Sequence, residues 1–187
     1  QVTKKLDMNI VSAGFDPISK LNEIPDNPKQ RYKIMTQDMP LGGELSLDMM
    51  YRTCGTQLNI DFNSEEDFVK KFKIVNSIVP IAISLFANSS IVEKKNSNYL
   101  SYRSKVWQST SRAGLPKLFL ENLNFEKYAD FVTNFPILFL KHNDQYISGR
   151  KYIFKDFIEG KIDEIDNRLP TQEDLATHLS TIFTENR

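Results

Sequence analysis

The sequence is poor in the residues on which several kinds of site depend, with one cysteine, two histidines and seven glycines among 187 residues. Cys54 has no second cysteine with which to form a disulfide inside the chain. His142 and His178 stand far apart without a cysteine beside either, so the ligand spacing of a zinc site is missing. The glycines form neither a phosphate-binding loop nor a nucleophile elbow. The sequence therefore supports neither phosphate binding by a glycine-rich loop nor a hydrolase with a nucleophile elbow.

The sequence also lacks an excess of either charge and a long apolar run. Twenty-four basic residues balance 24 acidic ones, so nucleic acid is not an expected partner. The longest apolar run, 77–87 (SIVPIAISLFA), contains Pro80 and is too short to span a bilayer, so no membrane partner is expected. A single cysteine fits a reducing compartment. We therefore expect a soluble, cytoplasmic protein.

With 40% hydrophobic residues, the chain can bury the core of one domain, which we expect to span 1–187. Ser64 followed by Glu65, Glu66 and Asp67 predicts the start of a long helix, because carboxylates are favourable in a first turn. From Ile78 onward apolar residues occupy nearly every side of this helix, which predicts burial all round and a kink at Pro80. The other predicted helices are 28–39, 98–110, 124–140 (broken near Pro136), 152–160 and 171–183, with a short helical turn after 45 and a strand at 144–147. The sum is a mostly helical α+β pattern.

The stretch 56–62 (TQLNIDF) alternates as a strand with one dry face does. Leu58, Ile60 and Phe62 would pack inward, and the other face would carry Gln57, Asn59 and Asp61. The simplest interpretation is a polar face in water. Asn and Asp are poor strand formers, however, and short polar groups on a rigid strand also suit a binding site. Both interpretations stay open at this point.

The stretch 102–112 (YRSKVWQSTSR) carries a second signal. On a helix that also includes Tyr99, the side chains of Tyr99, Arg103 and Trp107 would share a face, because they stand four residues apart. Arg103 could then stack on Trp107 as a surface pair, or project past the ring as a planar fork for a carboxylate or phosphate. Arg112, beside Gly114 in sequence, could turn back toward the same place.

Seven collinear stretches resemble the plant-type glutamate-cysteine ligases, a family that belongs to the glutamine-synthetase-like superfamily. They are RYKIM (31–35), MP (39–40), LDMMYRTCGTQLNIDF (47–62), LFANS (85–89), LSYRSKVWQST (100–110) with RAGLP (112–116), FEKYADF (125–131) and HLSTIF (178–183). The resemblance implies an antiparallel sheet curved into a bowl, with helices packed outside. It also implies the first step of glutathione biosynthesis, in which ATP with Mg²⁺ phosphorylates the side chain of glutamate before the amine of cysteine displaces phosphate.

The resemblance implies roles for particular residues as well. Arg103, in the family's R-S-x-[IV]-W motif, would clamp the α-carboxylate of glutamate, and Trp107 would wall the site. Arg52 and Arg112 are weaker candidates for a substrate or phosphate contact. Gln57, Asn59 and Asp61 would line the bowl. One departure is Leu138, which stands where a pocket tyrosine is usual in the family.

The family's metal-binding glutamates and a further stretch after HLSTIF have no counterpart here, so no metal ligand is assigned to this segment. We therefore expect a central part of the catalytic domain, truncated at both ends and inactive when produced alone. Two alternatives remain: a non-catalytic binding or interaction module on the same scaffold, and a related amide-forming ligase with another amine acceptor.

Overall fold

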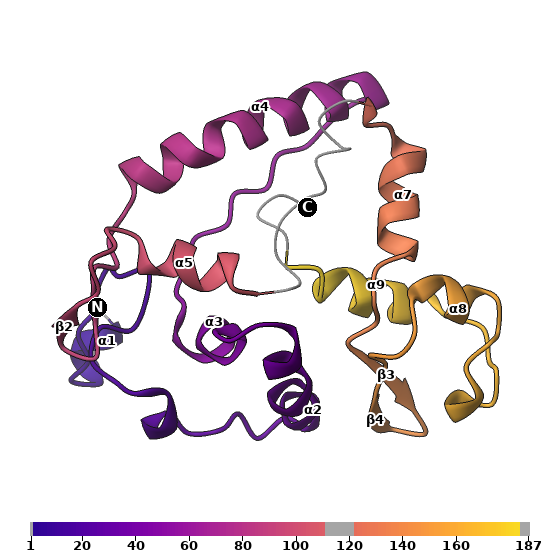
Figure 1. Cartoon of the computed structure of the whole chain (residues 1–187), viewed down its shortest axis with the longest axis horizontal. Helices are drawn as coiled ribbons and strands as arrows, with labels where there is room; N and C mark the ends of the chain where they lie inside the picture. Colours follow the sequence, from indigo (N-terminus) through magenta and orange to yellow (C-terminus); the bar gives the residue numbers. More distant parts are fainter. Residues whose placement is uncertain (1, 111–121, 184–187) are drawn as a thin grey trace.

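The structure is a computed structural model that describes residues 2–110 and 122–183, and it is a mostly helical α+β arrangement (Figure 1). The helices are α1 (Val2–Lys5), α2 (Gln30–Asp38), α3 (Ser46–Arg52), α4 (Glu65–Leu85), α5 (Tyr102–Gln108), α7 (Phe125–Thr133), α8 (Phe154–Ile158) and α9 (Gln172–Ser180). Short 3-10 turns lie at Leu21–Glu23, Met39–Gly42 and Asp163–Ile165. The strands are β1 (Ile91–Val92), β2 (Lys95–Asn96), β3 (Phe139–His142) and β4 (Gln145–Ser148).

These strands form two antiparallel hairpins, β1 with β2 and β3 with β4. The β3–β4 hairpin turns at Asn143 and Asp144, which both adopt the positive φ that such a turn needs. The α+β composition is thus confirmed, and the strand predicted at 144–147 is present. Within the described residues the two hairpins are separate sheets, so a bowl-shaped sheet is not seen.

The long helix α4 begins as the sequence predicts, with the Ser64 hydroxyl accepting a hydrogen bond from the Asp67 amide at 3.1 Å. Its first half packs on α7, where Phe68 and Phe72 contact the ring of Tyr128. It continues through Pro80 along the upper edge of the molecule in Figure 1. The prediction that its second half is buried is wrong, because Ile81 is 65% exposed. No element in the described part of the chain covers that end.

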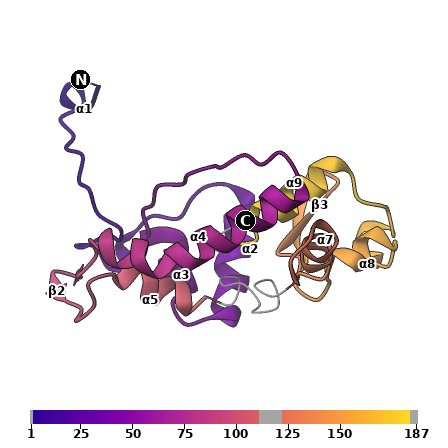
Figure 2. The same cartoon turned by 90° about the horizontal axis from the view of Figure 1, so that it is seen from above.

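The stretch predicted as a strand, 56–62, is an extended segment without strand pairing, and it lies between the end of α3 and the start of α4 (Figure 1 and Figure 2). Leu58 is 82% exposed, and the side chains of Ile60 and Phe62 are also exposed. The strand prediction is therefore wrong for the structure as described. Alternation alone does not make a strand, because the backbone needs a neighbour with which to hydrogen bond, and the described residues supply none here.

The core lies on both sides of the segment 137–140, which contains the first half of β3. Leu138 and Phe139 pack into one cluster with Phe15, Met35, Met39, Met49 and Val106. Ile137 and Leu140 pack into a second cluster with Phe154, Phe157, Ile162 and Ile165. Leu138 is therefore a core residue. This apolar segment joins the α2–α3–α5 region to the α8–α9 region.

Two helix boundaries differ from the predictions. The helix predicted over 98–110 is the shorter α5, which begins at Tyr102, and Tyr99 lies before it. The helix predicted over 124–140 ends at Thr133, and residues 139–142 form β3 instead. Among the described residues, no helix combines the length and apolar character that crossing a membrane requires.

Candidate functional site

Arg103 stands in the first turn of α5, and its guanidinium lies over the ring of Trp107, with Cζ 5.1 Å from the ring centroid. The stack that the four-residue spacing predicts is therefore present. Arg103 Nε also donates a hydrogen bond to the Cys54 carbonyl at 3.0 Å. Its backbone amide donates to the Ser89 hydroxyl at 3.1 Å. Both the backbone amide and the guanidinium of Arg103 thus make hydrogen bonds to neighbouring segments.

Two glycines leave the space in which the Arg103 side chain lies. A Cβ atom at Gly55 would come within 3.1 Å of Arg103 Nη2, and one at Gly14 would lie 3.5 Å from Arg103 Cδ. Neither glycine has a positive φ, so both matter here for the room they leave and not for their backbone freedom. The guanidinium therefore lies close against the backbone of the 14 and 55 segments.

Arg52 lies at the end of α3 and is only 4% exposed. Its Nη1 pairs with Asp48 at 2.8 Å and with Glu93 at 3.4 Å, and its Cζ lies 4.5 Å from the centroid of the Phe15 ring. The Nε and Nη2 atoms are buried without a hydrogen-bond partner among the described residues. Removing one partner of such a buried ion pair destabilises a fold strongly, because it leaves the other charge buried and unpaired. The geometry favours a structural role over a contact with substrate.

The three polar residues predicted to line the site lie on the extended segment 56–62. Gln57, Asn59 and Asp61 are all exposed on the extended segment, where the Asp61 carbonyl accepts a hydrogen bond from Lys71 Nζ at 2.7 Å. Arg112 lies outside the described residues. Residues 2–110 and 122–183 contain no group of three or more His, Cys, Asp or Glu side chains that could hold a metal ion.

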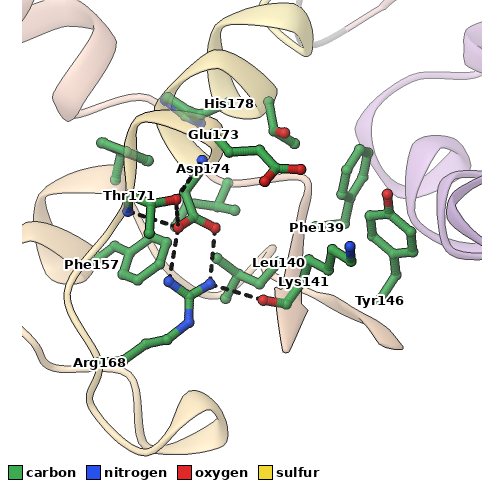
Figure 3. A pocket seen from close by; sticks show the side chains of 13 residues that line it. Phe139, Leu140, Lys141, Tyr146, Phe157, Arg168, Thr171, Glu173, Asp174 and His178 are labelled. Atoms are coloured by element: carbon green, nitrogen blue, oxygen red, sulfur yellow. Dashed lines mark hydrogen bonds and ion pairs between the residues drawn. The ribbon is translucent and has the colours of Figure 1, made fainter. Parts of the chain in front are cut away.

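A separate pocket of about 310 Å³ opens between the β3–β4 hairpin and α9 (Figure 3). Its floor is apolar and includes Leu140, Phe154 and Phe157. Buried His178 also lines it, with its ring stacked on Phe154 at 4.5 Å between centroids and its Nε2 2.8 Å from the Val132 carbonyl. His178 is therefore not a surface residue, and its Nε2 lies beside a carbonyl of the last turn of α7.

One wall of the pocket is a forked ion pair between Arg168 and Asp174, at 2.8 and 2.9 Å (Figure 3). Arg168 also donates to the Lys141 carbonyl at 2.8 Å and lies over the ring of Phe157. Burial of the Asp174 carboxyl opposes its ionisation. The hydrogen bonds from Arg168 and Thr171 outweigh that effect and lower its pKa to about 2.

This pocket is not among the features predicted from the sequence. A signal was present: Thr171 and Asp174 have the spacing of a capping box at the start of α9, and Arg168 stands three residues before it. At the rim, Lys141 pairs with Asp144 at 3.3 Å. Most charges of the pocket are thus already matched within the protein, which weakens it as a candidate for anion binding.

Comparison with known proteins shows which family the chain resembles. A model of the glutamate-cysteine ligase family 2 matches residues 1–187. Over its full length the chain is 42% identical to glutamate-cysteine ligase A, chloroplastic, of Oryza sativa subsp. japonica, and covers 38% of that protein. It is also 42% identical to the chloroplastic glutamate-cysteine ligase of Nicotiana tabacum, and 40% identical to that of Arabidopsis thaliana, covering 36% of each. The chain therefore spans little more than a third of the length of these relatives.

The names of these relatives overturn one expectation. All three are named as chloroplastic proteins, which contradicts the cytoplasmic location expected from composition. Composition cannot distinguish the cytoplasm from the chloroplast, because a low cysteine count fits any reducing compartment and is not a targeting signal.

Proposed function

Because this chain belongs to the glutamate-cysteine ligase family 2, we propose that it is part of an enzyme that joins glutamate to cysteine at the expense of ATP, the first step of glutathione biosynthesis. The substrates are glutamate, cysteine and ATP. The names of the relatives support a plastid location.

One observation carries the proposal for this segment: the guanidinium of Arg103 is fixed in position before any substrate binds. Stacking on Trp107 fixes the plane of the fork, and the hydrogen bond from Nε to the Cys54 carbonyl fixes its rotation. A planar guanidinium held in this way meets both oxygens of a carboxylate at once. We assign Arg103 to the α-carboxylate of glutamate and Trp107 to the wall of the site.

The extended segment 56–62 supplies the second part of the proposal. Its exposed apolar side chains and its lack of strand pairing suit a strand whose partners lie in other parts of the full-length protein. We propose that it joins a curved antiparallel sheet there, with Gln57, Asn59 and Asp61 facing the substrates. Leu58 and Ile60 would then lose the exposure that they have here.

ATP and Mg²⁺ complete the proposed reaction, in which ATP supplies the phosphoryl group that activates the glutamate side chain. The described residues do not fit a magnesium site, because no cluster of carboxylates is present among them. The proposal therefore places the metal ligands elsewhere in the full-length protein. The part played by the residues described here is to bind and orient glutamate.

The lack of a carboxylate cluster among the residues that the structure describes also fits a second candidate, a binding module that keeps the scaffold without catalysis. The two candidates differ in a single assay on the full-length protein. Release of ADP is measured with Mg²⁺-ATP, glutamate and cysteine, and again with each amino acid omitted. The proposed enzyme requires glutamate for ADP release and produces γ-glutamylcysteine when cysteine is present. Absence of ADP release with all substrates supports the module, and release with another amine in place of cysteine supports a related ligase.

A further inference from the structure

Two short segments far apart in sequence are joined beside Arg103. The Asp16 amide donates to the Arg52 carbonyl at 2.8 Å, and the Cys54 amide donates to the Gly14 carbonyl at 3.0 Å. Between these two bonds Phe15 and Thr53 form an isolated antiparallel bridge. Residues 14–16 and 52–54 therefore make one small ladder, and the Cys54 carbonyl that accepts from Arg103 Nε belongs to it.

The side chain of Arg52 holds this ladder together from inside the core. Its guanidinium lies 4.5 Å from the centroid of the fully buried Phe15 ring, the central residue of the opposite segment. Through Glu93 it is tied to the loop between β1 and β2, and through Asp48 to the preceding turn of α3. Because the ladder is held by only two backbone hydrogen bonds, it depends on side-chain contacts such as these for its rigidity.

Two glycines that lie against the Arg103 side chain belong to this ladder or directly follow it. Gly14 precedes Phe15 and Gly55 follows Cys54, and these are the two glycines against which the Arg103 side chain lies. A shift of one segment relative to the other would move the Cys54 carbonyl and both glycines at once. The orientation of the Arg103 fork is thus coupled to the contact between Arg52 and Phe15.

We propose that Arg52 is a positioning residue for the Arg103 fork, acting through the ladder of residues 14–16 and 52–54 and not through contact with substrate. The inference deepens the function proposed above, since Arg103 is the group assigned to glutamate. Lysine at position 52 keeps the charge near Asp48 but has no planar face to lie on Phe15. Arg52→Lys is therefore the informative change.

The first test measures the hydrogen bond itself and needs no assumption about activity. In full-length protein labelled with ¹⁵N-arginine, the Nε–H signal of Arg103 is identified by its loss in Arg103→Lys. We expect its exchange with solvent to become roughly tenfold faster in Arg52→Lys, as loss of one hydrogen bond implies. Unchanged exchange overturns the inference. If Arg52→Lys does not fold, Glu93→Gln removes only the longer ion pair, at the half-exposed end, and is expected to change the exchange in the same direction by less.

The second test is a double-mutant cycle on the KM for glutamate in the same protein. Arg52→Lys should raise this KM several-fold with little change in the KM for ATP, and adding it to Arg103→Lys should raise it no further. Additive effects of the two changes would mean that Arg52 acts independently of Arg103, which contradicts the inference.

Arg168→Lys is the matched control, because Arg168 also combines an aspartate pair with a phenylalanine contact but touches none of the segments around Arg103. It should lower stability and leave the KM for glutamate unchanged. A glutamate KM that is unaffected by Arg103→Lys would show that the proposed clamp is wrong, while the exchange measurement would still decide the role of Arg52.

Discussion

Gly55→Ala is a sharp steric test of the Arg103 site, because it adds a single methyl group at a known distance. The new Cβ would lie 3.1 Å from Arg103 Nη2, 3.6 Å from Cζ and 3.7 Å from Nε. The first distance is too short for an ordinary contact, so the guanidinium must move by a few tenths of an ångström. The movement would strain the 3.0 Å bond from Nε to the Cys54 carbonyl.

The size of the effect follows from how steeply rate depends on position. A misplacement of about 1 Å can cost roughly 100-fold, so a few tenths correspond to about three- to tenfold if the cost scales with displacement. We expect kcat/KM for glutamate in the full-length enzyme to fall by that factor, mainly through a higher KM, because the displaced group is the one assigned to binding glutamate. Folding stability should change little, because the gain of about 0.4 to 1 kcal/mol expected when alanine replaces glycine at a position without positive φ is opposed by the strained contact with Arg103.

The assay combines steady-state kinetics, with one substrate varied at a time, and a thermal melt. Gly149→Ala is the control, because its Cβ would come within 2.4 Å of Ile137 Cγ2 in the core and should lower the melting temperature without a specific effect on glutamate. A Gly55→Ala enzyme with unaltered glutamate KM would refute the close contact between Gly55 and a substrate-binding Arg103.

Three further predictions concern stability and completeness. Phe157→Ala should lower the free energy of unfolding by about 3 to 5 kcal/mol in a denaturant titration, because this ring is fully buried in the cluster around α8. The pKa of Asp174 is lowered from 3.8 to about 2, so its ionised form stabilises the fold above about pH 4, and that contribution disappears as the pH falls to about 2. The difference in stability between wild type and Asp174→Asn should therefore shrink across this range. Thermal melts at stepped pH measure it. The 187-residue chain produced alone should release no ADP above background and should bind a hydrophobic dye, because large apolar side chains such as Leu58 and Ile81 are exposed. Robust turnover by this chain would contradict the placement of the metal ligands in parts of the full-length protein outside these 187 residues.

Local features of the fold could be predicted from the sequence where a short stretch contains its own cause. The start of α4 follows from the Ser64 cap and three acidic residues, and the start of α9 from Thr171 and Asp174. The Arg103–Trp107 stack likewise needs only helical spacing. Each of these depends on atoms within one turn of helix, so the sequence is sufficient.

Features that depend on distant partners could not be predicted in the same way. The alternation of 56–62 indicates a strand, but a strand needs a neighbour, and the described chain offers none. The apolar second half of α4 is exposed for a similar reason. Arg52 packs on Phe15, which lies 37 positions earlier in the sequence, and no local sequence pattern predicts this contact. The family resemblance supplied the role of Arg103, which spacing alone left open between a surface stack and a clamp.

The KM for glutamate of full-length Arg103→Lys tests the central claim most directly. Lysine keeps the charge but cannot meet both oxygens of a carboxylate, and each charge-assisted hydrogen bond is worth about 1.5 to 3 kcal/mol. Losing one of two should therefore raise the KM for glutamate by roughly tenfold or more, while the KM for ATP and the circular dichroism spectrum stay close to wild type. A glutamate KM equal to that of the wild type would show that Arg103 is a surface partner of Trp107 and does not bind substrate.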